Sequence, residues 1–242
     1  MNKRAQISLL LLAGASGAVD ALAFTALGTV FAGVMTGNLV LLGISAGRGF
    51  WNDVGAPLLA LGGYAVGAAL TALVCRGVRR DGGRGAWPGQ VVGCLAAQTV
   101  LLGFVAVTGG VLGGEPSGAW RDVLLVVAAV AMGGQSAAMV AAGTGAAPTT
   151  YFTGTLTTLV TGTVDGSARG AGQWWVAGRL FAVVGAAAAA VALWRAAAPW
   201  GFVPPAVLTA AAVVCQKPAQ RLRRAVTSVH ENPLHGPGNG TL

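Results

Sequence analysis

The chain has 242 residues, of which 55% are apolar and only 9% are charged, and its mean hydropathy is +0.70. A soluble domain carries about a quarter charged residues, so this composition excludes a water-soluble globular protein. Lysine and arginine outnumber aspartate and glutamate, 15 to 7, and they gather at helix ends and in the C-terminal tail, which favours contact with an anionic lipid surface over nucleic acid.

The N-terminal stretch has some features of a cleavable signal peptide, because Lys3 and Arg4 precede an apolar run and then small residues at 13–18. The apolar character continues past Ala18 to Val34, and cleavage would delete Asp20 from one half of the duplication described below. We therefore expect this stretch to be retained as a signal anchor and as the first membrane span.

Six apolar stretches approach or reach the roughly 20 helical residues that a bilayer core requires. Two shorter apolar segments, residues 34–47 and 152–164, carry a Thr-Gly pair near their start and are too short to span comfortably. These two are predicted to be re-entrant or broken half-helices. The six predicted spans lie near residues 7–29, 55–75, 90–111, 122–142, 174–193 and 202–214.

Two parts of the chain, about half its length apart, read as copies of each other. In each copy a small-residue motif in one span is followed by a Thr-Gly half-helix and then by Gly-Ala-Ala, with spacings that agree to within about one residue. Internal repeats of this kind build many transport proteins. The matching segments are 17–20 with 133–136, 36–39 with 153–156, and 67–69 with 185–187.

The basic residues predict how the chain crosses the membrane. They form clusters at residues 3–4, 76–84 and 217–224, and positive residues collect on the cytoplasmic side. All three clusters fall on that side only if the Thr-Gly segments do not cross the membrane. Each repeat then has three spans, an odd number, so the two repeats are inverted relative to each other and both termini are cytoplasmic.

Asp20 is the only acidic residue deep inside a predicted span. A charge there costs about 2.5 to 3.5 kcal/mol on insertion scales, so it normally faces a cavity or a partner. Two interpretations stay open: an ion or proton path, for which Asp20→Asn would fold but lose transport, and a hydrogen bond that caps a half-helix or holds helices together. Gln135 has the matching place in the second copy and keeps the hydrogen-bonding capacity without the charge.

The Thr-Gly pairs predict a binding site near the membrane midplane. A helix that begins inside the membrane exposes unpaired N–H groups, which Thr36 and Thr153 would cap, while Gly37 and Gly154 allow another backbone to approach. The positive ends of two such half-helices attract anions or dipolar solutes. The alternative is that Thr and Gly are simply tolerated in tightly packed helices. Further polar side chains nearby are Asn38, Thr155, Thr157 and Thr158.

Other polar residues give weaker signals. Arg179 lies about a turn inside the fifth span and would pair with Asp20, bind an anion or, as the favoured interpretation, extend to the membrane surface. Gln98 and Tyr64 are candidate cavity-lining residues. The three cysteines are expected to act as small apolar residues, and the two histidines to be solvated in the tail, so that no metal site, cofactor or enzymatic activity is expected.

A family resemblance follows from these motifs. Residues 17–21, 35–39, 132–135 and 152–156 together resemble the YoaK-like family of bacterial inner-membrane proteins of unknown function. The likeness covers nearly the whole chain up to Cys215. It implies a six-span protein of the bacterial inner membrane, and it brings no substrate or reaction. Where that family's second half often carries a Gln-Asn pair this chain has Gln-Ser, which puts a role for the serine in doubt.

Together these features predict an all-α membrane protein with one membrane domain, residues 1–215, made of inverted three-helix repeats at about 7–111 and 122–214, and a disordered basic cytoplasmic tail, 216–242. The predicted function is a small-solute or ion transporter or channel in a lipid bilayer, with a central site at the repeat interface. A non-transporting membrane scaffold or accessory subunit is the alternative. The predicted site residues are Asp20, Thr36, Gly37, Asn38, Gln135, Thr153, Gly154 and Thr155.

Overall fold

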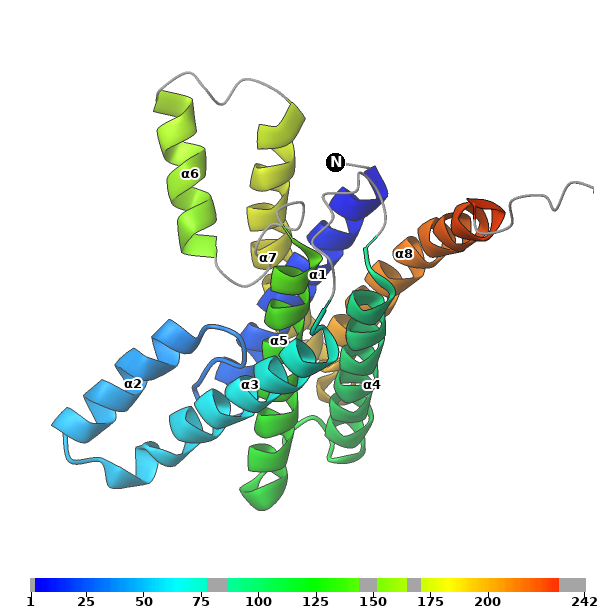
Figure 1. Cartoon of the computed structure of the whole chain (residues 1–242). Coiled ribbons are helices and arrows are strands. Elements are labelled where there is room, and N and C mark those ends of the chain that lie inside the picture. Colours follow the sequence, from blue (N-terminus) through cyan, green and yellow to red (C-terminus); the bar gives the residue numbers. More distant parts are fainter. Residues whose placement is uncertain (1–2, 78–86, 144–151, 165–170, 231–242) are drawn as a thin grey trace, which may run out of the picture.

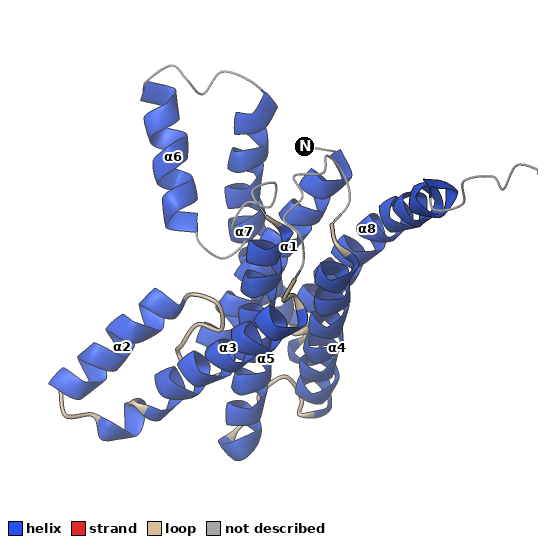
Figure 2. Ribbon diagram, viewed as in Figure 1, coloured by secondary structure: helices blue, strands red, loops and turns tan. Residues whose placement is uncertain are grey.

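The computed structural model describes residues 3–77, 87–143, 152–164 and 171–230, and every regular element in these ranges is a helix (Figure 2). Six stretches are long and apolar enough to cross a membrane, which confirms the six predicted spans. The helices that form them are α1 (Lys3–Ala26), α3 (Gly55–Val74), α4 (Gly89–Val111), α5 (Gly118–Ala142), α7 (Ala171–Ala196) and α8 (Val203–His230).

Two further helices, α2 (Met35–Gly47) and α6 (Phe152–Val164), coincide with the predicted Thr-Gly segments and have 13 residues each. Thirteen residues make about 20 Å of helix, which is less than the roughly 30 Å of a bilayer core. Neither helix can cross the membrane in a straight path. The short 3-10 turns η1 (Trp51–Asp53) and η2 (Ala198–Trp200) lead into α3 and α8 (Figure 1).

The last helix is longer than the predicted sixth span. Helix α8 continues to His230, so helical backbone extends past Gln216, where the sequence predicts the start of a disordered tail. The sequence from 217 to 230 has no glycine and, apart from Pro218, consists largely of good helix formers such as alanine, arginine and glutamine, so a helix that has already formed can continue through it. Residues 231–242 of the predicted tail lie outside the described residues.

Buried apolar side chains form two clusters, one toward each end of the helix bundle. The first joins the C-terminal halves of α1 and α4 to the N-terminal half of α5 and to Phe202. The second joins the N-terminal halves of α1 and α4 to the C-terminal half of α5 and to Ala212 and Val213 of α8. Helices α1 and α5 are therefore antiparallel, and so are α4 and α8.

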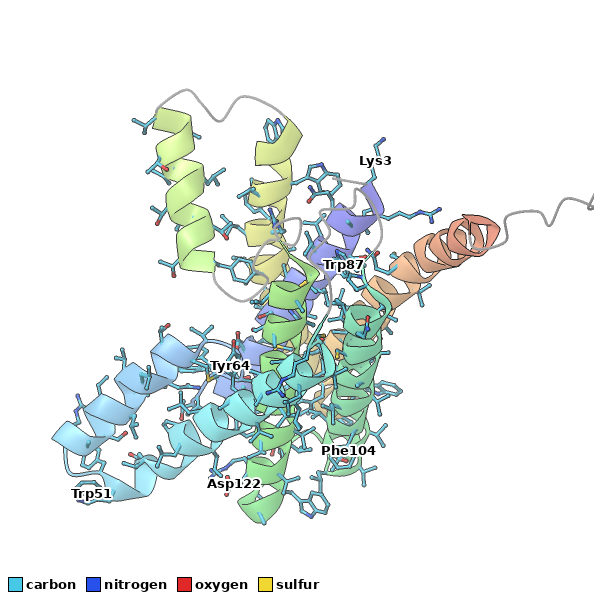
Figure 3. The ribbon with its side chains drawn as sticks, in the orientation of Figure 1. Lys3, Trp51, Tyr64, Trp87, Phe104 and Asp122 are labelled. Carbon is cyan, nitrogen blue, oxygen red and sulfur yellow. The ribbon has the colours of Figure 1, made fainter. Side chains whose placement is uncertain are left out.

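The two ends of the bundle are named here by a residue at each. Figure 3 shows Lys3 and Trp87 toward one end, the Lys3 end, and Trp51 and Asp122 toward the other, the Asp122 end. The chain starts at the Lys3 end, returns to it after α3 and after α5, and runs from the Asp122 end toward the Lys3 end along α8.

Small residues bring α3 and α5 into close parallel contact. A Cβ atom on Gly67 would overlap the backbone carbonyl oxygen of Val130, and one on Gly133 would overlap the carbonyl oxygen of Tyr64. Gly63 meets the same face of α5 one turn earlier. Gly63 and Gly67, four residues apart, thus fit the small-xxx-small pattern of close helix packing, and the space that these glycines leave is filled by helix backbone.

Candidate functional site

The carboxylate of Asp20 binds the loop that leads into α2. Asp20 is buried, and its Oδ1 accepts a hydrogen bond of 2.6 Å from the backbone N–H of Gly33. Backbone hydrogen bonds from Ala32 and Val34 also reach this carboxylate. Consecutive N–H groups directed at one anion form a nest, and the positive end of α2 favours the same negative charge. Asp20 therefore holds the loop at the start of α2 in place.

Asn38 closes the same loop from the other side. Its side-chain nitrogen donates to the carbonyl oxygen of Phe31 at 2.6 Å, and its side-chain oxygen accepts from the N–H of Phe31 at 2.9 Å. The Phe31 ring stacks on Phe24 of α1, with the ring centroids 5.2 Å apart. A Cβ atom on Gly37 would come within 2.9 Å of the Phe31 ring. Gly37 and Asn38 thus hold α2 against Phe31, which in turn packs on α1.

Thr36 does not cap α2. The helix begins at Met35 with Val34 at the N-cap position, and no side chain forms a cap hydrogen bond there. Thr36 is exposed in the first turn. The predicted role of Thr36 as the N-cap is wrong, because the helix begins earlier than the Thr-Gly pair and because Asp20 supplies the polar partner just ahead of it.

Gln135 lies in the core between three long helices. Its Oε1 accepts a hydrogen bond of 2.6 Å from Gln98 of α4, and its Nε2 donates to the carbonyl oxygen of Leu12 of α1 at 3.2 Å. Both glutamines are almost completely buried. Gln135, the predicted counterpart of Asp20, thus ties α1, α4 and α5 together, and Gln98, a candidate cavity-lining residue, is part of the same contact.

The second Thr-Gly pair lies in the first turn of α6, which packs on α7. Thr153 and Gly154 are exposed and Thr155 is partly buried, and a Cβ atom on Gly154 would have no neighbour within 4 Å among the described residues. Thr157 and Thr161 follow Thr153 at one-turn intervals, and each donates its hydroxyl hydrogen to the carbonyl oxygen one turn back, at 3.0 Å. Exposed hydroxyl groups therefore line one face of α6.

The predicted site residues occupy three places. Asp20, Gly37 and Asn38 meet at the loop before α2, and Thr36 lies in the first turn of α2. Gln135 lies in the core, and the first turn of α6 carries Thr153, Gly154 and Thr155. Figure 1 shows α2 beside α3 and α6 beside α7, with α6 toward the Lys3 end and α2 toward the other. A cavity shared by both Thr-Gly pairs stays a prediction.

Arg179 differs most from its predicted role. It is 5% exposed, and its Nε donates to the carbonyl oxygen of Trp175 at 3.3 Å. Among the described residues it makes no ion pair with Asp20, whose carboxylate is bound to backbone N–H groups. The favoured interpretation, a side chain that extends to the membrane surface, is wrong. Helix periodicity could have found this, because Arg179 lies on the α7 face that packs against another helix.

One polar contact between α1 and α8 has no clear signal in the sequence. Gln216 donates its side-chain N–H to Ser8 Oγ at 3.0 Å, and Ser8 donates to the carbonyl oxygen of Ala212 at 3.1 Å. All three residues are buried. A serine among alanines and leucines reads as one more small residue of a tightly packed helix, so its hydrogen bond was not predictable.

Comparisons with known proteins agree with this architecture. The profile of the family described as "Protein of unknown function (DUF1275)" matches residues 8–215. The chain is 30% identical over 152 residues to the UPF0700 transmembrane protein YoaK of Bacillus subtilis (strain 168), and the match covers 63% of this chain and 64% of that protein. The chain therefore spans just under two thirds of the length of this relative. No solved structure matches the chain.

Proposed function

This chain belongs to the DUF1275 family of proteins of unknown function, and we propose that it is a small-solute or ion transporter or channel built from two inverted repeats. The resemblance to the YoaK-like family is confirmed. With its six apolar helices, the chain is a multi-pass membrane protein whose surface contacts the lipid bilayer. The repeats, their orientation and the transport role are the proposed part.

The helix contacts support a duplication. Helix α3 packs along α5 and α7 packs along α1, while α4 packs on α5 and α8 packs on α1. In the proposed duplication, α1 corresponds to α5, α3 to α7 and α4 to α8. Exchanging the two helices of each pair turns the α3–α5 contact into the α7–α1 contact, and it turns the α4–α5 contact into the α8–α1 contact. The contact of α4 with α8 and that of α1 with α5 are unchanged by the exchange. An approximate twofold relation between residues 3–111 and 118–216 accounts for this pattern.

The directions of the helices support inversion. Counterpart helices run antiparallel, as the two core clusters indicate for α1 with α5 and for α4 with α8. The close contacts also correspond, because Gly17 of α1 lies against the backbone of Val183 in α7, as Gly133 of α5 lies against that of Tyr64 in α3. An axis in the membrane plane relates the halves of many transporters in this way.

The two short helices carry the transport proposal. Both are 13 residues long, and both follow the first helix of their repeat. Both are shorter than the helices around them, which are long enough to span a membrane. Discontinuous helices in inverted repeats form the substrate sites of many transporters near the bilayer midplane. The exposed hydroxyl groups of Thr153, Thr157 and Thr161 would line that path in the second repeat.

The charge distribution supports a cytoplasmic Lys3 end in a bacterial inner membrane. Lys3, Arg4 and Arg76 lie at that end, the sequence 79–84 after Arg76 adds three more arginines, and the basic cluster 217–224 follows the sixth span toward it. The other end has only Arg48, Arg121 and Arg195 among the described residues. Positive residues favour the cytoplasmic side. Both termini, the loop after α3 and the loop after α6 are then cytoplasmic.

A specific observation favours the alternative of a membrane scaffold or accessory subunit. Asp20, Asn38 and Gln135, the polar side chains that would line a path, all donate to or accept from groups of the protein itself. Buried polar groups with internal partners stabilise a fold without any ligand. On this alternative, the half-helices serve packing only, and no solute crosses.

Solute flux decides between the two functions. Purified protein in liposomes would be tested by stopped-flow light scattering with glycerol, urea, acetate, phosphate and sulfate. We expect faster flux of at least one of these solutes than in protein-free liposomes, because a wetted path replaces the hydrocarbon barrier. Gly154→Trp should return the rate to the protein-free value, since the ring would fill the open space at the start of α6.

Gly185→Trp is the matched control, because Gly185 of α7 is also exposed and open to a side chain but lies outside the proposed path. Equal loss of flux in both variants would mean that the substitutions impair folding or membrane insertion, and not that Gly154→Trp blocks the path. Rates equal to those of protein-free liposomes for the whole panel would support the scaffold.

A further inference from the structure

Arg179 is a buried charge on a helix that otherwise faces outward. On α7, Trp174, Phe181 and Val184 are 80%, 77% and 67% exposed, whereas Arg179 is 5% exposed. Exposed apolar side chains suit the lipid, and charged ones within a span face the protein interior. The guanidinium group is therefore enclosed by protein on the face of α7 that packs against α1.

The hydrogen bonding of this guanidinium is incomplete. Arginine has five N–H donors. The Nε donor of Arg179 goes to the carbonyl oxygen of Trp175, one turn back on the same helix. The Nη1 nitrogen is buried and has no partner among the described residues. A buried charge of this kind normally has an ionic or strongly hydrogen-bonding partner, because leaving it alone is very unfavourable.

No described acidic side chain supplies that partner. Asp20 is bound by backbone N–H groups, and Asp122 lies beside Arg121, with 3.3 Å between the carboxylate oxygen and Nε. Asp53 and Glu115 belong to the turns at the Asp122 end of the bundle, whereas Arg179 lies in the first part of α7, next to Gly178, which faces Leu10 of α1. The described part of the chain thus contains a buried cation without an anion.

The two repeats differ in the buried charges that they carry at equivalent positions. Gly67 corresponds to Gly185, so Leu61 is the counterpart of Arg179, and Gln135 is the counterpart of Asp20. The second repeat has therefore lost a buried negative charge and gained a buried positive one. In the first repeat, the chain provides its own carboxylate to the half-helix. The second repeat has a buried donor group, the guanidinium of Arg179, but the position equivalent to Asp20 carries Gln135 and provides no anion.

We propose that Arg179 binds an oxyanion, the carboxylate, phosphate or sulfate group of a small molecule, on the face of α7 that meets α1. The planar guanidinium group presents paired donors that match two oxygens of such a group. The oxyanion can belong to a soluble solute or to a lipid headgroup, because Arg179 lies only five residues after the start of the span Trp174–Ala196. This inference deepens the proposed function by naming a solute class, and binding tests it separately from flux.

The test measures the thermal unfolding midpoint of the full chain in maltoside micelles, titrated with sulfate, phosphate or acetate against chloride at constant ionic strength. We expect a saturable rise with at least one oxyanion. Arg179→Gln should weaken the apparent affinity about tenfold or more, which corresponds to one lost charge-assisted contact. Arg179→Lys keeps the charge but loses the paired donors, so it should weaken binding while preserving the fold. Arg195→Gln, an exposed arginine at the other end of α7, should bind as the unaltered chain does.

A second arm distinguishes the source of the oxyanion. In nanodiscs, a midpoint that is higher in phosphatidylglycerol than in phosphatidylcholine, with the difference lost in Arg179→Gln, identifies a lipid headgroup. A response to soluble oxyanions in phosphatidylcholine identifies a solute. Either result supports the proposal.

Two results would overturn the proposal. One is an equal oxyanion response in the unaltered chain and in both Arg179 variants, and the other is no response in either arm. If, in an unresponsive chain, removing one acid outside the described residues destabilises the protein as much as Arg179→Gln does, Arg179 belongs to an internal ion pair. The acids to test are Asp81, Asp165 and Glu231.

Discussion

Replacing Asp20 with alanine is expected to lower the free energy of unfolding by about 3 kcal/mol, because buried N–H groups lose their shared charged acceptor. The Gly33 N–H, 2.6 Å from the carboxylate oxygen, loses this partner, and Ala32 and Val34 lose theirs. Asp20→Asn keeps an oxygen at the same place, so we expect a loss of about 1 kcal/mol for the weaker neutral bond. Unfolding in mixed micelles titrated with dodecyl sulfate measures both values.

Asp53→Ala is the matched control, because Asp53 is exposed in η1 and its removal should leave stability unchanged. Equal stability of the Ala and Asn variants would contradict a role for Asp20 in holding the loop. Flux through Asp20→Asn then separates the two interpretations of the sequence. The backbone contacts lead us to expect that this variant keeps any solute flux, whereas a folded variant without flux would support an ion or proton path.

Placing a methyl group on Gly67 is expected to destabilise the protein by about 3 kcal/mol, because the new atom would overlap the backbone of α5 and would force two helices apart. The overlapping atom is the carbonyl oxygen of Val130, which cannot rotate away as the end of a flexible side chain can. The midpoint of the same dodecyl sulfate titration would report Gly67→Ala.

Gly62→Ala on the same helix is the control for this change. A Cβ atom on Gly62 would have no neighbour within 4 Å among the described residues, so alanine should leave stability unchanged or raise it by up to about 1 kcal/mol through its higher helix propensity. If Gly67→Ala were as stable as Gly62→Ala, close backbone contact would not be what holds α3 against α5.

Much of the fold was predictable because it depends on local properties. The six spans follow from apolar runs of the length that a bilayer requires, and the breaks before α2 and α6 follow from polar and small residues inside such runs. Glycines at one-turn spacing on α3 indicate tight packing, but that α5 is the partner came only from the structure. Helix α8 was predicted too short, since its basic residues lower the hydropathy without lowering the helix propensity.

The partners of the polar residues were not predictable in the same way. Gln135 donates to Leu12, which is 123 positions away, so that bond depends on how the two halves pack and not on local sequence. Asn38 was expected beside a solute, yet its amide matches the N–H and carbonyl group of Phe31. The side chain of Arg179 was expected to extend to the membrane surface because the residue lies about one turn from the end of its span. Its direction around the helix, toward α1, decides its burial.

The most direct test of the inverted arrangement is the side of the membrane on which four loops lie. In a chain with its native cysteines replaced, single cysteines would be introduced as Gly49→Cys, Asp81→Cys, Glu115→Cys and Ser167→Cys and labelled in intact cells with a membrane-impermeant maleimide. We expect labelling from outside at positions 49 and 115, and at positions 81 and 167 only after lysis, because in the proposed arrangement neither α2 nor α6 crosses the membrane. Labelling of position 81 from outside with protection of position 49 would mean that α2 crosses the membrane, and it would contradict the two inverted three-span repeats.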